Sequence, residues 1–392
     1  MNRLSLYIHI PFCVRKCHYC DFLSAPYEEE TRQEYVEALC IEIVQRAKLY
    51  KERTVDTIFF GGGTPSLLSA KQMGEIMDTV RQEFQVLPEA EISMEVNPGT
   101  VDREKLKAYK AYGINRLSIG LQSANNEELK VLGRIHTWEV FENTWNQVRE
   151  LGFSNVNVDL MSALPGQTLE SYENTLRKVI ALKPEHISAY SLIIEEGTKF
   201  YEWFGDDSSQ LPDEVADRQM YELTRTLLEE YGYHRYEISN YALKGYECKH
   251  NVGYWKRKEY LGLGLGAASL LSNVRSSNTS DLAEYLELGQ KVNQQIAMQE
   301  DVKDIKWIAG QEELTIQDQM EEFMFLGLRM MEGISSLEFE KQFDKSLQDV
   351  YGTQISKLEK QGLLQFHEET QRYTLTLQGI DVSNQVFVEF IE

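Results

Sequence analysis

Residues 4–20 of the chain read LSLYIHIPFCVRKCHYC. The first half, residues 4–11, is apolar at most positions, which predicts a buried β-strand. The second half places Cys13, Cys17 and Cys20 in a C-x3-C-x2-C loop directly after that strand. Ligands of parallel α/β sheets gather where the strands end, so this loop is the first candidate for a functional site.

The strand-then-helix pattern continues to about residue 240. Five more apolar segments are predicted strands, and each precedes an amphipathic helical pattern. They cover residues 56–60, 91–96, 116–121, 156–161 and 186–193. Several are apolar almost throughout, as expected where helices cover the outer face of a parallel sheet. We therefore predict an α/β fold over residues 1–240, with either a barrel-like or an open sheet.

The rest of the chain divides into two parts. Residues 241–310 form a predicted connecting region, in which GLGLG at 262–266 indicates tight turns or close backbone approach. Residues 311–392 contain two helical patterns followed by short strands at 363–366 and 373–377. This order predicts a smaller C-terminal α+β domain that resembles a winged helix. Winged helices often bind DNA, but acidic residues far outnumber basic ones here, which argues against a nucleic-acid partner.

Composition narrows the function classes. The 392 residues carry a formal net charge of −22, which does not favour non-specific binding to nucleic acid or anionic lipid, since both are negatively charged. The first residues lack the apolar segment of a secretory signal, and no stretch reaches the roughly 20 apolar residues of a spanning helix. We expect a cytoplasmic protein whose five cysteines stay reduced, and which contacts a membrane at most through a partner.

The spacing of the clustered cysteines favours an iron–sulfur site. A short loop lets three thiolates reach three corners of one [4Fe–4S] cube and leaves the fourth iron open to another molecule. Zinc is one alternative, with His9 or His18 as its fourth ligand. Chance clustering of buried cysteines is another. Neither alternative explains why the loop closes a strand at the ligand end of an α/β fold, so a cluster on Cys13, Cys17 and Cys20 is preferred.

A glycine run indicates a polar ligand beside these cysteines. Residues 61–65 read GGGTP and follow the second predicted strand. Glycines at a strand end let backbone groups approach a ligand with no Cβ in the way. A lone glycine run is weak evidence, because most such runs are turns. Its occurrence together with the cysteine loop, each after a predicted strand, is the stronger signal.

In order and spacing, the two motifs resemble those of the radical S-adenosylmethionine (SAM) superfamily. The resemblance implies a partial, TIM-like (βα)6 barrel in which the open iron of a [4Fe–4S] cluster binds the amino and carboxylate groups of SAM. An electron from the cluster then cleaves the sulfonium to give a 5′-deoxyadenosyl radical, and the protein positions the reacting groups. By motif position, the implied SAM contacts are Tyr7, Tyr19, Gly62, Gly63, Thr64, Glu95, Gln122, Arg134 and Asp159.

Each implied contact has an alternative role. The two tyrosines are packing aromatics in that alternative, and the polar residues are helix caps or an ion-pair network with Arg134. Arg134 is predicted in a helical segment, where an arginine usually faces solvent. Glu95 ends the third predicted strand, where its carboxylate would accept hydrogen bonds from ribose hydroxyls or an amino group.

Several segments resemble one branch of that superfamily, which contains the oxygen-independent coproporphyrinogen III oxidases (HemN) and the haem chaperone family HemW. The resemblance covers nearly the whole chain. The matching segments are residues 7–13 (YIHIPFC), 61–65 (GGGTP) and 120–123 (GLQS), with 326–329 (LGLR) and 375–379 (LTLQG) in the terminal domain.

Two features favour the chaperone family. The oxidases carry a further cysteine two positions after the third cluster ligand and an N-terminal extension, whereas this chain has Phe22 there and begins its first strand near residue 4. HNVGYW at residues 250–255 is similar to the H-N-x-x-Y-W motif of the chaperones. His250 is the implied haem ligand, because imidazole is a common axial ligand of haem iron. A hydrogen-bonded structural histidine is the alternative.

The resemblance implies a haem chaperone that binds haem, a [4Fe–4S] cluster and SAM, and that hands haem to acceptor proteins. Its expected partners are haem-accepting proteins and an electron donor. The rival hypothesis is an enzyme that converts coproporphyrinogen III to protoporphyrinogen IX. A third is an iron–sulfur protein without a nucleotide site, and the glycine motif and Glu95 count against it.

Overall fold

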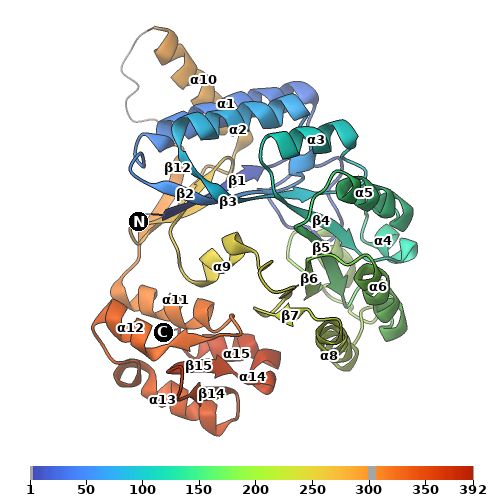
Figure 1. Cartoon of the computed structure of the whole chain (residues 1–392), viewed down its shortest axis with the longest axis vertical. Helices are drawn as coiled ribbons and strands as arrows, with labels where there is room; N and C mark the ends of the chain where they lie inside the picture. Colours follow the sequence, from blue (N-terminus) through green and yellow to red (C-terminus); the bar gives the residue numbers. More distant parts are fainter. Residues whose placement is uncertain (1–2, 299–305, 392) are drawn as a thin grey trace.

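The computed structural model describes residues 3–298 and 306–391. It contains a curved α/β layer and a smaller C-terminal domain, with one short helix between them (Figure 1). Part of the predicted connecting region, residues 299–305, lies outside the described residues.

Six parallel strands form the centre of the large sheet, in the order in which they occur in the chain. They are β1 (Arg3–Ile10), β2 (Thr54–Gly62), β3 (Gln85–Val96), β4 (Arg116–Gln122), β5 (Val156–Ser162) and β6 (His186–Ser191). Each lies within a few residues of a segment that the sequence predicts. The partial (βα)6 barrel is therefore confirmed.

Helices cover the outer face of this sheet (Figure 1). They are α1 (Glu29–Ala47), α2 (Ala70–Glu83), α3 (Arg103–Ala111), α4 (Asn126–Val131), α5 (Trp138–Glu150), α6 (Leu169–Ala181) and α8 (Glu214–Glu230). Helix α7 (Lys199–Phe204) packs on the cysteine loop instead, and a short 3-10 helix, η1 (Pro65–Leu67), follows β2. Local sequence explains where several begin. At α2, for example, the Ser69 hydroxyl accepts a hydrogen bond from the Gln72 backbone N–H, and the Gln72 side-chain oxygen accepts one from the Ser69 backbone N–H.

Much of the predicted connecting region extends the barrel sheet. Strand β9 (Tyr260–Leu263) pairs in parallel with β1, and antiparallel β10 (Ala268–Leu271), β11 (Val274–Asn278) and β12 (Ile308–Glu313) follow. Strands β8 (Asn240–Ala242) and β7 (His234–Arg235) add to the β6 edge. Helices α9 (Lys249–Trp255) and α10 (Leu282–Ala297) also belong to this region. The proposed boundary at residue 311 therefore falls inside β12.

The glycine run at 262–266 makes the close backbone approaches that the sequence indicates. A Cβ on Gly262 would lie 2.1 Å from the Ala268 carbonyl oxygen. Gly264 has φ +96°, and a Cβ there would lie 2.4 Å from the Tyr35 hydroxyl. A side chain at Gly262 would separate β9 from β10, and one at Gly264 would clash with Tyr35 of α1.

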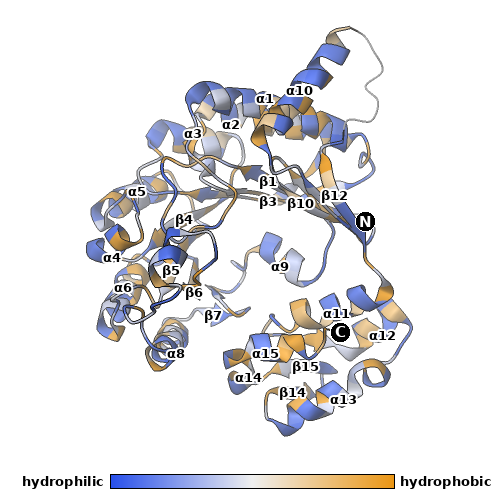
Figure 2. Cartoon of the chain, turned by 180° about the vertical axis from the view of Figure 1, so that it is seen from behind, coloured by the Kyte–Doolittle hydropathy of each residue, from blue (hydrophilic) through white to orange (hydrophobic). Residues whose placement is uncertain are grey.

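The C-terminal domain has the predicted winged-helix-like form. Its helices are α11 (Ile316–Gly327), α12 (Ser336–Phe343), α13 (Leu347–Lys360), α14 (Leu377–Asp381) and α15 (Ser383–Val388). Strands β13 (Ile334–Ser335), β14 (Leu364–His367) and β15 (Arg372–Leu375) form a second sheet in the order β13-β15-β14. The domain has a core of its own, to which all five helices contribute apolar residues, and Figure 2 shows apolar positions on these helices.

Candidate cluster and nucleotide site

A cavity of about 330 Å³ opens at the carboxyl ends of the barrel strands. All of the residues predicted for the cluster and for SAM line it, except Tyr7. They are Cys13, Cys17, Tyr19, Cys20, Gly62, Gly63, Thr64, Glu95, Gln122, Arg134 and Asp159. Residues that are far apart in the chain thus meet in one place because parallel strands end at one edge.

Backbone contacts fix the cysteine loop over this cavity. Phe12 and Ala25 form a β-bridge, so the loop returns to the strand end where it began. The Arg15 guanidinium donates to the Gly133 carbonyl at 2.7 Å, and the His18 N–H donates to Leu132 O at 3.0 Å. These contacts hold the loop independently of any cluster.

The three thiols suit an iron–sulfur cluster better than a single metal ion. In residues 3–298 and 306–391, no three His, Cys, Asp or Glu side chains are placed to hold one ion, which a mononuclear zinc site requires. Thiolates that each bind a different iron of a cube lie further apart. Burial raises the pKa of the Cys20 thiol to about 11, a desolvation penalty that bonding to iron would relieve. The residues present therefore fit a [4Fe–4S] cluster.

The glycine motif passes close to the cysteine loop. Gly62 has φ +114°, and a Cβ on it would lie 2.6 Å from the His9 ring. A Cβ on Gly63 would lie 2.6 Å from the Phe12 carbonyl oxygen and 3.0 Å from Cys13 Sγ. Only glycine fits at either position, so backbone groups of this turn face the space beside the cysteines.

Two acidic residues lie across the cavity floor. Glu95 on β3 accepts a hydrogen bond from the Gly62 N–H at 3.2 Å. Burial and the neighbouring Asp159 raise the pKa of Glu95 to about 8. Asp159 on β5 accepts from Asn157 at 2.7 Å and Ser118 at 3.1 Å, and burial raises its pKa as well. Buried carboxylates of this kind bind cationic or hydroxyl-bearing ligands well.

Arg134 lies in the loop between α4 and α5, not in the helical segment where it was predicted, and it is part of a polar chain. Its Nη2 donates to Gly120 O at 2.6 Å and to Asn97 Oδ1 at 2.7 Å. Asn97 in turn donates to Thr64 Oγ1 at 2.8 Å. Arg134 Nη1 lies 3.7 Å from Cys17 Sγ. The chain therefore links the glycine motif to the cysteine loop, with Asn97 at its centre.

Sequence reasoning did not assign Asn97 to the site. Its signal was present, because Asn97 directly follows β3, as Gln122 ends β4. Tyr190 was also missed, and its hydroxyl donates to Gln122 Oε1 at 3.3 Å. Both residues belong to the ligand end of a strand, which is the rule that located the other site residues.

Tyr7 lies outside the cavity lining. Its hydroxyl is 3.0 Å from His9 Nδ1, while His9 Nε2 is 2.9 Å from the Leu23 carbonyl oxygen. A carbonyl can only accept, so Nε2 carries the proton and the Tyr7 hydroxyl donates to Nδ1. Tyr7 thus orients the ring that packs against Gly62, and its direct contact with SAM stays a prediction.

His250 lies deep in the protein, away from this cavity. Its Nδ1 is 2.8 Å from Thr57 Oγ1 and its Nε2 is 2.9 Å from the Tyr254 hydroxyl. The ring stacks on Phe59 at 5.2 Å. Burial and the nearby Arg116 lower the pKa of His250 to about 3, so the ring is neutral. With both nitrogens hydrogen-bonded, its role as a haem ligand stays a prediction.

The HNVGYW motif ties α9 to both parts of the protein. The Glu91 carboxylate on β3 accepts from the Lys249 and His250 backbone N–H groups, each at 3.1 Å, and so caps the start of α9. At the other end of the helix, the Arg329 guanidinium lies 4.5 Å from the Trp255 ring centroid. The motif therefore connects the barrel to the terminal domain.

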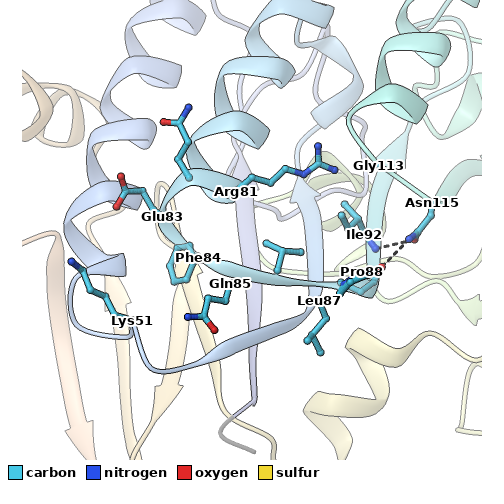
Figure 3. Close-up of a pocket in the computed structure, with 13 residues that line it drawn as sticks. Lys51, Arg81, Glu83, Phe84, Gln85, Leu87, Pro88, Ile92, Gly113 and Asn115 are labelled. Carbon is cyan, nitrogen blue, oxygen red and sulfur yellow. Dashed lines mark hydrogen bonds between the residues drawn. The ribbon is translucent and has the colours of Figure 1, made fainter.

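A separate polar hollow lies at the start of β3 (Figure 3). Its lining includes Lys51, Arg81 and Asn115, and it shares no residue with the cysteine cavity. The Asn115 amide bonds the Ile92 N–H and the Ala90 carbonyl, so it stabilises the turn into β4. We assign no function to this hollow.

Replacing Glu95 with glutamine should reduce the loss of stability of the ligand-free protein at alkaline pH. Because the folded-state pKa of Glu95 is raised to about 8, the folded protein holds this proton more tightly than the unfolded chain. Stability therefore falls as the pH rises from the ordinary carboxyl range to about 8, and stays low above it. Urea unfolding at about pH 6 and about pH 9 measures this fall.

The exposed Glu34 on α1 provides the control, because Glu34→Gln removes a carboxylate far from the cavity. We expect the wild type and Glu34→Gln to lose similar stability between the two pH values, and Glu95→Gln to lose less. Equal losses in all three proteins would contradict a buried, protonated Glu95.

The described residues contain no helix that is both long enough and apolar enough to span a bilayer.

Comparison with known proteins places these features in a family context. Residues 7–179 match the Radical SAM superfamily, and residues 314–382 match the HemN C-terminal domain. The haem chaperone HemW of Bacillus subtilis is 36% identical over 388 residues, which cover 99% of each chain. The Escherichia coli HemW is 44% identical over 265 residues, or 67% of this chain and 69% of that one.

A solved structure gives the same result for the fold. Coproporphyrinogen III oxidase (HemN) from Escherichia coli, a radical SAM enzyme, superposes with a TM-score of 0.83 at 26% identity. The match covers 99% of this chain and 90% of that one.

Proposed function

Because the chain belongs to the HemW family of radical SAM haem chaperones, we propose that it binds haem and delivers it to acceptor proteins. The whole-length similarity to the Bacillus subtilis chaperone, over 99% of both chains, is the observation that carries this proposal. We further propose that an electron donor serves its cluster. The five cysteines are all free thiols, which suits action in the reducing cytoplasm.

The cavity at the strand ends would hold the family cofactors. Cys13, Cys17 and Cys20 would each bind one iron of a [4Fe–4S] cluster. When bound, such a cluster supplies one electron to the sulfonium of SAM. The backbone of Gly62 and Gly63 would orient the methionine end of SAM, and Arg134 would pair with its carboxylate.

The acidic residues of the cavity would bind the other polar groups of the nucleotide. Glu95 would accept from ribose hydroxyls or the amino group, and Asp159 lies close enough to share that task. A cationic ligand there would lower the pKa of Glu95 and favour the ionised form. These residues bind and orient, and none of them needs to turn over a substrate.

Phe22 supports a carrier over the oxidase. It stands where the oxidases have a further cysteine, lines the mouth of the cavity and is 59% exposed. An exposed phenyl ring offers apolar contact but no proton, electron or metal-binding group. The residue at this position therefore cannot repeat the role of a thiol.

Two assays on the same reconstituted protein separate the chaperone from the enzyme. We expect ferric haem to bind with one saturable Soret band and to move to an added haem-free haemoprotein. We expect no protoporphyrinogen from coproporphyrinogen III, SAM and reductant under anaerobic conditions. Steady formation of protoporphyrinogen would overturn the proposal in favour of the oxidase, and absence of saturable haem binding would overturn it altogether.

A further inference from the structure

A second large cavity lies at the opposite end of the barrel. It measures about 620 Å³, within the roughly 300–1,000 Å³ of small-molecule sites. The amino-terminal ends of β1, β2 and β3 form one side, and α9 and the turn after α11 form another. Figure 1 shows α9 between the barrel and the C-terminal domain. Lys249 and Val252 of this helix line the cavity.

Helix α9 has two different faces. His250 and Tyr254, four residues apart, bond to each other and face Thr57 and Phe59 of the barrel. Lys249, Val252 and Lys256 follow the spacing of the other face and line the cavity. The histidine of the motif therefore anchors the helix, while the opposite face is available to a ligand.

One part of the cavity is apolar. Met330 and Met331, in the turn after α11, line it together with Val252 and Tyr236. Met330 is only 6% exposed, and the Met331 N–H donates to Tyr236 O at 2.9 Å, which fixes this turn against β7. Thioether and aromatic side chains adapt well to a flat apolar ligand.

Charged side chains of both signs line another part of the cavity; the basic ones are Arg3, Arg235, Lys249, Lys256 and Lys258, and the acidic ones are Asp56, Glu89, Glu247 and Glu332. Arg3 is paired with Asp56, and Lys256 is paired with Glu332. Lys249 and Lys258 also line the cavity, and within the described residues neither has a carboxylate partner. Two ammonium groups without ion pairs are suited to a ligand that carries two carboxylates.

The cavity also contains a histidine whose ring is oriented by a carboxylate. His234 on β7 has its Nε2 2.8 Å from Glu247 Oε1. Histidines that ligate metals usually donate their second N–H to a carboxylate, which fixes the tautomer and leaves the other nitrogen to the metal. In the part of the chain that the structure describes, Nδ1 of His234 has no hydrogen-bond partner.

We propose that this cavity is the haem site, with His234 Nδ1 as an axial ligand and with Lys249 and Lys258 paired to the two propionates. The proposal rests on the haem binding proposed above and adds its location and ligands. An apolar wall, two cations and a histidine held by a carboxylate match the apolar face, the two propionates and the iron of haem.

The location has a consequence for the two cofactors. Arg3 borders this cavity, and Ile10 at the other end of β1 leads to the cysteine loop. Seven residues of strand separate them by about 23 Å. Haem and SAM therefore occupy separate sites, and saturating SAM does not displace haem.

Titration of the full-length protein with ferric haem tests the site. His234→Ala is expected to weaken haem binding by about 10- to 100-fold and to change the Soret maximum, because an iron ligand is lost. Glu247→Gln is expected to alter the electron paramagnetic resonance signal of the bound haem, because Glu247 positions the ligand. The exposed His367 of β14 gives the matched control, His367→Ala, which should bind as the wild type does.

A second variant covers the case in which His234→Ala fails to fold. Lys249→Glu combined with Lys258→Glu reverses the charge at two exposed positions of the site and is expected to weaken haem binding at least tenfold. If the wild type binds haem and both variants bind it equally well, this location is wrong and the proposed function stands. If the wild type itself does not bind haem, both proposals are overturned. Displacement of haem by saturating SAM would also contradict a separate site.

Discussion

Cys17→Ser should leave the protein without its iron–sulfur cluster, and iron content and visible absorbance should fall to background after anaerobic reconstitution. The serine hydroxyl is much less acidic than the cysteine thiol, and its oxygen is a harder donor than sulfur, so it binds iron of the cube poorly. The cube would therefore lose one of only three protein ligands. SAM affinity should fall with it, because the open iron provides part of the SAM site in this family. Iron analysis and equilibrium binding of SAM measure the two losses.

Cys40 supplies the control for this experiment. It lies in α1, away from the cavity, and is a free thiol like Cys17. Cys40→Ser should therefore keep the full cluster and bind SAM as the wild type does. The loop itself should survive in Cys17→Ser, because the bonds from Arg15 to Gly133 and from His18 to Leu132 do not involve a thiol. Retention of a full cluster by Cys17→Ser would show that the thiol is not a ligand.

The position of this site could be predicted because ligand sites of parallel α/β folds lie at the carboxyl ends of the strands. The cysteine loop, the glycine motif and Glu95 each follow or end an apolar segment, and parallel strands bring such residues to one edge. Local sequence contains that information in full. The contact between Asn97, Thr64 and Arg134 was different, since it depends on the path of the α4–α5 loop. Long-range loop packing leaves no periodic signal in the sequence.

Strands β9 to β12 were also hidden in the sequence. They are short, and antiparallel β11 and β12 are mostly polar, with β12 exposed along nearly its whole length, so no long apolar run identifies them. His250 shows the opposite difficulty. The motif around it is distinctive, but whether its ring bonds to Thr57 or to a ligand depends on how α9 docks on the barrel. Burial of a single side chain is a tertiary property.

A buried acidic residue contributes to the docking of the C-terminal domain on the barrel. Glu322 on α11 is 4% exposed. Its carboxylate accepts from Arg257 Nε at 2.6 Å and from Arg275 Nη2 at 2.5 Å. Arg257 follows α9 and Arg275 lies on β11, so both cations belong to the barrel side. The interaction therefore joins the terminal domain to the same region that forms the second cavity.

Glu322→Ala should lower the free energy of unfolding by about 3–5 kcal/mol, because it leaves the buried Arg257 guanidinium without its anion. We also expect faster proteolysis between the barrel and α11, and weaker haem binding if haem lies in the second cavity. The cluster should be unaffected, since its ligands are at the other end of the barrel. Urea unfolding, limited proteolysis and iron analysis measure these three effects.

The exposed pair of Glu173 and Arg177 on α6 gives a matched comparison, with side chains 37% and 51% exposed. Glu173→Ala removes one partner of an ion pair that water already solvates, so it should change stability by less than about 1 kcal/mol. A similar small change in Glu322→Ala would mean that the two arginines find other partners or water. The docking of the domain would then rest on the other contacts of this interface, such as the Arg329 guanidinium over the Trp255 ring and the ion pair of Lys256 with Glu332.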